Sequence, residues 1–274
     1  MKIPERNNSI SSSLIKLKDE DWLSKQRIAG KTVAQALQLL SSLVKEKSPL
    51  SLLEMNGLAE QFIISQGCTP TFKYYKDFPA GVCISVNRQL VHGIPTNNSL
   101  KEGDVVSFDL GATYEGAISD AAITCIYGEP KQDNHVQLIQ STKTALELAI
   151  REVQVGKRLG SIGNTIFKCG REDGFSVITE YGGHGLDWNR PHSLPFVSNR
   201  SEINDGIRAQ KGLTIAIEPL FAIGSNRTRV ASDNWTVYTE DVSAHFEHTI
   251  YVHQDHVEVL TRPDATLIPI RSNI

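Results

Sequence analysis

The sequence predicts an α+β domain in which two similar halves share a central antiparallel sheet. The first observation is a repeat: Gly103 to Asp109 and Gly212 to Glu218 each consist of a glycine, five residues and an acid that ends an apolar run. The second is the order of elements, because each half reads as two helices followed by strands, which favours the α+β class. The third is that no Pro-, Gly- or Ser-rich linker separates the halves, so we expect one shared core.

A helical period opens the first half near residues 19–21. Apolar residues recur at roughly helical spacing over 22–44, which predicts the first helix. Ser51 and Glu54 have the spacing of a capping box, and Gly67 is a suitable C-terminal stop for the second helix. A strand over 82–87 follows, and it leads to the loop that carries His92.

Two β-rich runs, Val105–Leu110 and Ala121–Tyr127, predict a hairpin with its turn over 111–116. Asp109 lies near the end of the first run, and Asp120 immediately precedes the second. A hairpin can bring two such carboxylates together. Neighbouring carboxylates cost free energy unless a cation or a shared proton lies between them.

The second half repeats this order. A helical pair is predicted to open at 132–134, with Ser161 as the cap of its second helix. A strand then leads to the Tyr181-Gly-Gly-His-Gly185 turn, and Glu247 starts a late strand as Asp120 does in the first half. Each half therefore offers two acids on strands, and a duplicated unit would place four carboxylates around one pseudo-twofold axis.

Composition limits the class of protein. The chain has 274 residues, of which 40% are hydrophobic and 22% charged, with a net charge of −3, so no basic excess indicates sequence-specific nucleic-acid binding. Four cysteines without a C-x-x-C pair make no disulfide framework, which favours a reducing compartment. The start has no apolar signal core, and no run approaches the ~18 residues of a membrane span. We expect a flexible N-terminal arm over 1–17 and a single catalytic domain over 18–274.

Five residues form the candidate metal-binding set. Such a hard, oxygen-rich set suits Mn²⁺, Fe²⁺, Co²⁺ or Zn²⁺ with open positions rather than a closed structural zinc site. Two divalent ions would lower the pKa of a shared water and polarise a carbonyl, which is the apparatus of hydrolysis. Taken singly, each acid is more often a solvated or ion-paired residue, and only the matched spacing in both halves favours a site. The set is Asp109, Asp120, His184, Glu218 and Glu247.

The other histidines include four that we expect to be structural: His135, His245, His253 and His256.

Several further stretches accompany these residues: Cys83-Ile-Ser-Val-Asn87, His92-Gly-Ile-Pro95, Ile217-Glu-Pro219, Trp235-Thr236 and Glu247-His-Thr-Ile250. With them, the chain from about residue 19 to residue 262 resembles the type I methionine aminopeptidases, which share the pita-bread fold with prolidases and creatinases. The 34-residue step from His184 to Glu218 leaves no room for the long insertion of the type II enzymes.

The resemblance implies a role for each ligand. Asp109, Asp120 and Glu247 would hold one metal ion, with Asp120 and Glu247 bridging to a second ion that His184 and Glu218 complete. Water would attack the first peptide carbonyl, and Glu218 would carry its proton. The implied activity is removal of the N-terminal methionine from nascent proteins and peptides whose second residue is small.

The resemblance also implies substrate contacts. His92 would lie beside the scissile amide, and His192 would hydrogen-bond the substrate and the developing oxyanion. Four residues would line the methionine pocket: Tyr75, Phe78, Cys83 and Trp235. Asn87 and Ser243 match positions that contribute to a monovalent-cation site. The implied partners are nascent polypeptide N-termini and the ribosome, for a monomeric cytoplasmic enzyme without a membrane role.

The chain departs from the family pattern at a few places. Residues 116–120 read Gly-Ala-Ile-Ser-Asp instead of a Gly-Tyr-His-Gly-Asp-like run, Phe72 replaces a common Cys, and Phe78 replaces a frequent Tyr. One additional residue precedes His192, and it either shifts that side chain and lowers turnover or bulges outward without effect. Two rival functions remain: a prolidase or X-Pro aminopeptidase, and a binding protein of the same fold without enzymatic activity.

Overall fold

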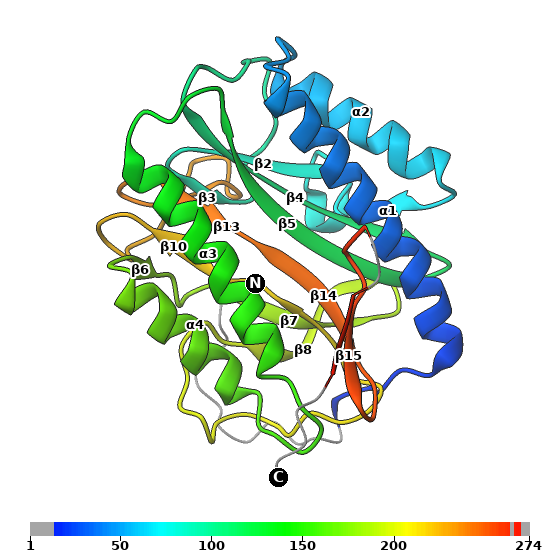
Figure 1. Cartoon of the computed structure of the whole chain (residues 1–274). Helices are drawn as coiled ribbons and strands as arrows, with labels where there is room; N and C mark the ends of the chain where they lie inside the picture. The colour runs from blue at the N-terminus through cyan, green and yellow to red at the C-terminus, as the bar shows by residue number, and fades with distance from the viewer. Residues whose placement is uncertain (1–13, 264–265, 270–274) are drawn as a thin grey trace.

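The computed structural model describes residues 14–263 and 266–269, and its elements follow in chain order (Figure 1). The helices are α1 (Glu20–Lys45), α2 (Leu52–Ser65), the 3₁₀ turn η2 (Tyr75–Asp77), α3 (Asp133–Arg151) and α4 (Gly160–Glu172). The strands of the first half are β1 (Thr69–Pro70), β2 (Val82–Val86), β3 (Gln89–Val91), β4 (Asp104–Tyr114) and β5 (Ala117–Tyr127). Those that follow are β6 (Ser176–Val177), β7 (Gly183–Asp187), β8 (Arg190–Val197), β9 (Thr214–Ile217), β10 (Leu220–Ala222), β11 (Arg229–Val230), β12 (Val237–Tyr238), β13 (Ser243–His245), β14 (Glu247–Val252), β15 (His256–Val259) and β16 (Thr266–Pro269).

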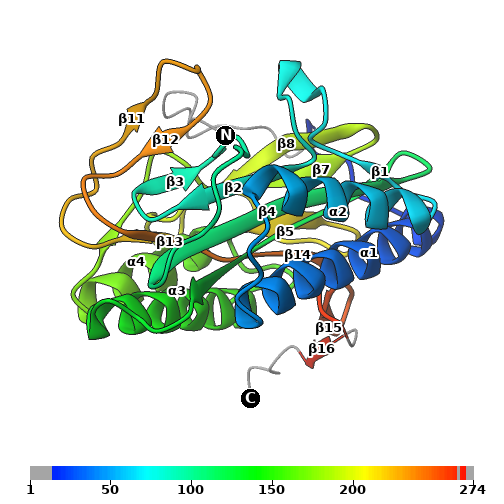
Figure 2. The same ribbon diagram turned by 90° about the horizontal axis from the view of Figure 1, so that it is seen from above.

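Within the described residues the main sheet has ten strands, and its central path runs β1-β4-β5-β14-β9-β7-β8 with antiparallel pairings. Strands β5 and β14 form the seam between the two halves of the chain. The α1–α2 pair lies over the first half and the α3–α4 pair over the second, and both pairs lie on the same side of the sheet (Figures 1 and 2). The expected α+β architecture with duplicated helices around one antiparallel sheet is confirmed.

The helix starts show which local signals the chain follows. Asp19 caps α1 by accepting a hydrogen bond from the backbone N–H of Trp22. Ser51 and Glu54 form the predicted capping box of α2. The prediction for Ser161 is wrong, because this residue lies inside the first turn of α4 and its hydroxyl donates to the carbonyl of Arg158.

The central hairpin is longer than predicted. Strands β4 and β5 pair over eleven positions, and the turn is the two-residue pair Glu115–Gly116, both with positive φ. Gly111 is therefore a strand residue, not part of the turn, and it pairs with Asp120. A Cβ at Gly111 would come within 3.0 Å of Thr71, so the glycine allows the β1 segment to approach closely.

The repeated glycines have a common structural role. Gly103 and Gly212 adopt left-handed φ angles of +75° and +87°, one residue before β4 and two residues before β9. Only glycine adopts this conformation without strain. Each glycine turns the chain into a strand that carries or precedes an acid six residues later, and this shared geometry explains the repeat in the sequence.

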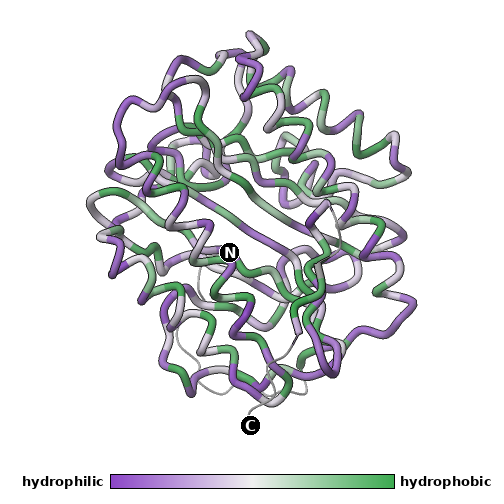
Figure 3. Tube along the Cα trace, in the orientation of Figure 1, coloured by the Kyte–Doolittle hydropathy of each residue, from purple (hydrophilic) through white to green (hydrophobic). Residues whose placement is uncertain are grey.

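Each half contributes its own large apolar cluster between its helices and the sheet. Figure 3 shows hydrophobic residues, in green, along the trace of both halves. One cluster joins α1 and α2 to β2 and β4, and the other joins α3 and α4 to β9, β14 and β15. Ile123 of β5 packs against both clusters. The helices and their clusters therefore make a rigid support for the central strands, which carry most of the candidate site residues.

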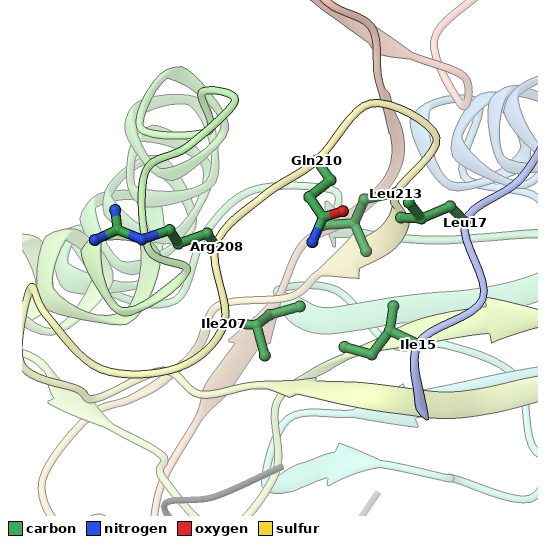
Figure 4. A pocket seen from close by; sticks show the side chains of 6 residues that line it. All are labelled: Ile15, Leu17, Ile207, Arg208, Gln210 and Leu213. Carbon is green, nitrogen blue, oxygen red and sulfur yellow. The ribbon is translucent and has the colours of Figure 1, made fainter. Parts of the chain in front are cut away.

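The end of the predicted arm can be described only from residue 14 onward, because residues 1–13 lie outside the described part of the chain. Ile15 and Leu17 line a small hollow with Ile207, Arg208, Gln210 and Leu213 (Figure 4). None of the predicted site residues lines this hollow.

Within the described residues, no helix is long and apolar enough to cross a membrane.

Candidate metal centre

Strand register aligns the acids in a first row across the sheet. Asp109 of β4 pairs with Ala122 of β5, and Ala122 pairs with Glu247 of β14. The β9–β14 register then places Glu218, the residue after β9, level with Glu247. Three carboxylates therefore lie along one line, and the small Ala122 side chain occupies the position between two of them.

A second row lies two residues away on the same face, since alternate residues of a strand face the same side. Asp120 is level with Thr249, whose hydroxyl accepts a hydrogen bond from the Asp120 N–H at 2.8 Å. Thr249 pairs with Ala216, and the β7–β9 register places His184 level with Ala216. Strand pairing thus brings the five predicted ligands from separate parts of the sequence to one place.

The ligand atoms form two overlapping groups. Asp109, Asp120 and Glu247 each offer an atom within 4.8 Å of the others, and so do His184, Glu218 and Glu247. Glu247 belongs to both groups. A third group under the same distance joins Asp120 and His184 to His192. The structure therefore places the predicted ligands as two neighbouring sets that share one carboxylate.

The electrostatics of these carboxylates call for positive charge. Burial, and then the negative charges around it, raise the pKa of Asp109 and of Glu247 well above the usual range. Burial and the neighbouring Glu218 raise the pKa of Asp120 to about 8. One oxygen each of Asp109, Asp120 and Glu247 has no hydrogen-bond partner among the described residues. Divalent cations would compensate both features, so the residues fit a metal site.

His184 has the orientation of a metal ligand. Its Nδ1 lies 3.2 Å from the carbonyl oxygen of Gly185, and a proton on Nδ1 would make this a hydrogen bond. Nε2 then carries a lone pair and faces Oε1 of Glu218 at 3.7 Å and Oε1 of Glu247 at 3.8 Å. A lone pair facing two carboxylate oxygens is repulsive unless a cation lies between them.

Glu218 differs from the other acids. Burial alone would raise its pKa, but the nearby His245 imidazole and the other charges around it lower the pKa to about 2. The backbone carbonyl of Glu218 accepts a hydrogen bond from Asn199 at 2.9 Å, which fixes the chain at the end of β9. Glu218 is therefore ionised at neutral pH and can accept a proton.

The two predicted substrate histidines lie beside the carboxylates. Burial lowers the pKa of His92 to about 4, and burial followed by the proximity of His184 lowers the pKa of His192 well below its usual value. Both imidazoles are therefore neutral near pH 7. The ring of His192 meets that of His184 edge-on, with centroids 4.6 Å apart. The additional residue before His192 thus leaves its ring beside the candidate metal ligands.

Three of the four predicted pocket residues belong to one apolar cluster. Phe78 and Cys83 are buried in it, and Trp235 packs against it. Tyr75 lies at the edge, with its ring 5.5 Å from the ring of His192. The cluster also contains residues that the pocket prediction omitted: Phe72, Ala80 and Ile94.

Phe72 contacts the site through His192, since the two rings stack with an interplanar angle of 14° and centroids 6.5 Å apart.

His245 was expected to be structural, but it lies against the carboxylates. Its Nε2 is 3.4 Å from Oε2 of Glu218 and 4.0 Å from Oε2 of Glu247. The signal in the sequence was its position two residues before Glu247, since this spacing places side chains on one face of an extended chain.

The predicted monovalent-cation residues also meet. The hydroxyl of Ser243 lies 3.4 Å from the carbonyl oxygen of Asn87 and 3.3 Å from that of Gln89. The Ser243 hydroxyl can donate to either carbonyl, so β13 is joined here to the chain at the start of β3, and a monovalent cation at Asn87 and Ser243 stays a prediction.

A model of metallopeptidase family M24 matches residues 24–254. The chain belongs to the M24 family of metallopeptidases. A methionine aminopeptidase from Mycoplasma capricolum is 42% identical over 253 residues, covering 92% of this chain and all of that protein. The crystal structure of a methionine aminopeptidase from Thermotoga maritima has a TM-score of 0.86 at 36% identity, covering 90% of this chain and 99% of the other.

A more distant structural neighbour is the prolidase from Pyrococcus furiosus, with a TM-score of 0.73 at 19% identity. It shares the fold, and 67% of its chain is covered. These comparisons confirm the resemblance to the methionine aminopeptidases that the motifs predicted, and they confirm the pita-bread fold. As an M24 metallopeptidase, this protein is a metal-dependent hydrolase, and its buried acids and His184 are groups that can bind divalent ions.

Proposed function

We propose that this M24 metallopeptidase removes the N-terminal methionine from nascent proteins and peptides whose second residue is small. The observation that carries the proposal is the pair of ligand groups that share Glu247, beside two neutral histidines and an apolar cluster. The printed names of the 42% identical and 36% identical relatives support the same activity.

Two divalent ions fit the paired groups: one would be held by Asp109, Asp120 and Glu247, and the other by His184 and Glu218 with the bridging acids. When bound, such ions lower the pKa of water and polarise the peptide carbonyl. Co²⁺, Mn²⁺, Fe²⁺ and Zn²⁺ all suit this mixture of carboxylates and one imidazole.

The remaining steps fall to residues of the chain. Glu218 is ionised, so it takes the proton of the attacking water and passes it to the leaving amine. His92 and His192 are neutral, so each donates a hydrogen bond to the substrate amide or its developing oxyanion. Burial of these groups excludes bulk water and strengthens each interaction.

The apolar cluster supports selection of methionine. Phe78, Cys83 and Trp235 offer aromatic and sulfur surface, and burial first and then the nearby acids raise the pKa of the Cys83 thiol, so it is uncharged. A flexible, polarisable thioether packs well against such a wall. Discrimination by one methylene is limited to ~1–3 kcal/mol, so leucine is the informative competitor.

We further propose that the enzyme acts as a monomer on nascent chains in the cytoplasm, in proximity to the ribosome. The net charge of −3 and the cysteine usage support a reducing compartment and no dedicated nucleic-acid surface. A monovalent cation at Asn87 and Ser243 would brace the β2–β3 turn that precedes His92.

The test is hydrolysis of Met-Ala-Ser, Leu-Ala-Ser and Ala-Pro-Ala by apoprotein supplied with Co²⁺, Mn²⁺ or Fe²⁺. We expect metal-dependent release of methionine from Met-Ala-Ser, with much slower cleavage of the other two. Asp120→Asn is the matched variant. It should lose metal and nearly all activity, because it removes a predicted bridging charge.

Preferred cleavage of Ala-Pro-Ala would instead favour the hypothesis that the protein is an X-Pro aminopeptidase. Stoichiometric metal binding without hydrolysis of any peptide would favour a binding protein.

A further inference from the structure

The backbone of His245 is fixed from both halves of the chain. His245 ends β13, where it pairs with Leu220 of β10. Its N–H donates to the hydroxyl of Thr124 at 2.9 Å, and the same hydroxyl donates back to the His245 carbonyl at 2.7 Å. Because Thr124 belongs to β5, the position of this residue is set by the central strands of the sheet.

The ring of His245 is almost fully buried, with 1% of the residue exposed. Neither of its ring nitrogens has a hydrogen-bond partner among the described residues. Burial of an imidazole without partners is costly, and buried polar groups are normally paired. An apolar side chain would avoid this cost at a position with no role.

The two buried histidines face opposite sides of the same carboxylates. His184 Nε2 lies near Oε1 of Glu218 and of Glu247, at 3.7 and 3.8 Å. His245 Nε2 lies near the Oε2 atoms of the same two residues, at 3.4 and 4.0 Å. Among the described residues, the candidate metal group that contains Glu218 and Glu247 includes His184, whose Nε2 faces their Oε1 atoms, and no such group includes His245.

We propose that His245 is a positioning residue: its Nε2–H donates to Oε2 of Glu218 and thereby holds Oε1 toward the metal ions. This role rests on the proposed function, in which Glu218 is a metal ligand. The present distance is a few tenths of an ångström longer than a good N–H···O hydrogen bond, and such contacts often tighten in the working complex. Groups that hydrogen-bond a metal ligand set its orientation and metal affinity.

The test compares variants that keep or remove the donor. His245→Leu removes it, whereas His245→Gln keeps an N–H at similar reach. We expect His245→Leu to lower Co²⁺ affinity and kcat for Met-Ala-Ser on the order of 10–100-fold, and to alter the visible spectrum of bound Co²⁺. KM should change little, and His245→Gln should recover most of each loss.

His135→Gln is the matched control, because His135 is also buried with its Nδ1 unpartnered, and it lies on α3 outside the ligand groups. Its Co²⁺ affinity and kcat should equal those of the original protein. If His245→Leu does not fold, His245→Asn replaces it. The Asn side chain is one methylene shorter than that of Gln, so its N–H does not reach Oε2 of Glu218.

Unchanged Co²⁺ affinity and spectrum in the variant without the donor would overturn the proposal. An equally impaired His245→Gln would overturn it too, because the donor would then not be the feature that matters. Co²⁺ binding is measured without peptide. A wild-type protein that binds Co²⁺ but leaves Met-Ala-Ser intact would therefore refute the proposed function and leave the test of His245 valid.

Discussion

Asp109 and Glu247 lie level with each other across the sheet, with only Ala122 of β5 between them. Both acids are almost fully buried, and each has one oxygen without a hydrogen-bond partner among the described residues. The space for an ion between them therefore depends on the small side chain of Ala122.

Replacing Ala122 with Val should weaken metal binding without removing any ligand. The added methyl groups would enter the first row and push the carboxylates apart, and overpacking of this kind costs ~1–3 kcal/mol. We expect Co²⁺ affinity, measured by titration calorimetry, to fall on the order of 10-fold or more, with a matching loss of activity.

Ala122→Ser is the control, because it adds a single small atom and should retain most of the metal affinity. A Val variant with unchanged affinity would show that the ions lie elsewhere than along this row.

Replacing His92 or His192 with Ala should lower kcat by roughly 10²–10³-fold, as expected when one transition-state hydrogen bond is removed. Metal occupancy, measured by elemental analysis, should stay near the original value for both variants. His192 is the more informative of the two, since it also lies within 4.8 Å of ligand atoms of Asp120 and His184. Loss of metal in His192→Ala would mean that this residue is a ligand and not a substrate contact.

The repeat made much of the fold predictable from the sequence. Gly103 and Gly212 give matched turns before matched strands, so the acids of both halves could be found from spacing alone. The row structure of the site could not be found in this way. These rows depend on the register between β5 and β14, which are about 120 residues apart in sequence. That register is set by the burial of both strands in the shared core.

Two misplaced features show where local signals fail. Gly111 was predicted to begin the turn because glycine is a typical turn residue, but the strands continue past it and Glu115–Gly116 forms a two-residue turn. The spacing of His245 and Glu247 places both on one face of an extended chain, but the contact of His245 with Glu218, the residue after β9, cannot be found from the local sequence. The first error concerns the local geometry of a turn and the second a tertiary contact, and sequence periodicity contains neither.

Deleting Asn189 tests the additional residue before His192. The Trp188–Asn189 pair forms the turn between β7 and β8, and the Asn189 N–H donates to the Gly116 carbonyl at 3.0 Å. The ring of Trp188 covers Gly116 so closely that a Cβ there would come within 2.7 Å of it. Deletion would break this contact and leave one residue to close the turn, so we expect kcat/KM for Met-Ala-Ser to fall.

Asn189→Gly is the control, because it keeps the chain length and tolerates the φ of +52° at this position. Its kcat/KM should remain near the original value. A deletion variant with higher kcat/KM would show instead that the additional residue limits turnover by displacing His192.

Asp187 should make the stability of the fold depend on acid pH. Burial raises the pKa of its carboxyl, but hydrogen bonds from Lys18, Lys16 and the Trp188 N–H outweigh burial and lower the pKa to about 2. In the unfolded chain the pKa is about 3.9. The folded state therefore binds fewer protons, and this contribution to stability is present above about pH 4 and is lost as the pH falls toward 2.

Asp187→Asn should accordingly lower Tm at pH 7, and the difference in Tm from the original protein should shrink between about pH 4 and pH 2. Thermal melts followed by circular dichroism measure this difference directly. Asp21→Asn is the control, because Asp21 pairs with Lys25 on the exposed surface of α1, where solvent screening leaves such a pair little effect on stability. A Tm difference for Asp187→Asn that stays constant from pH 7 to pH 2 would show that the Lys16 and Lys18 contacts do not depend on the charge of this carboxylate.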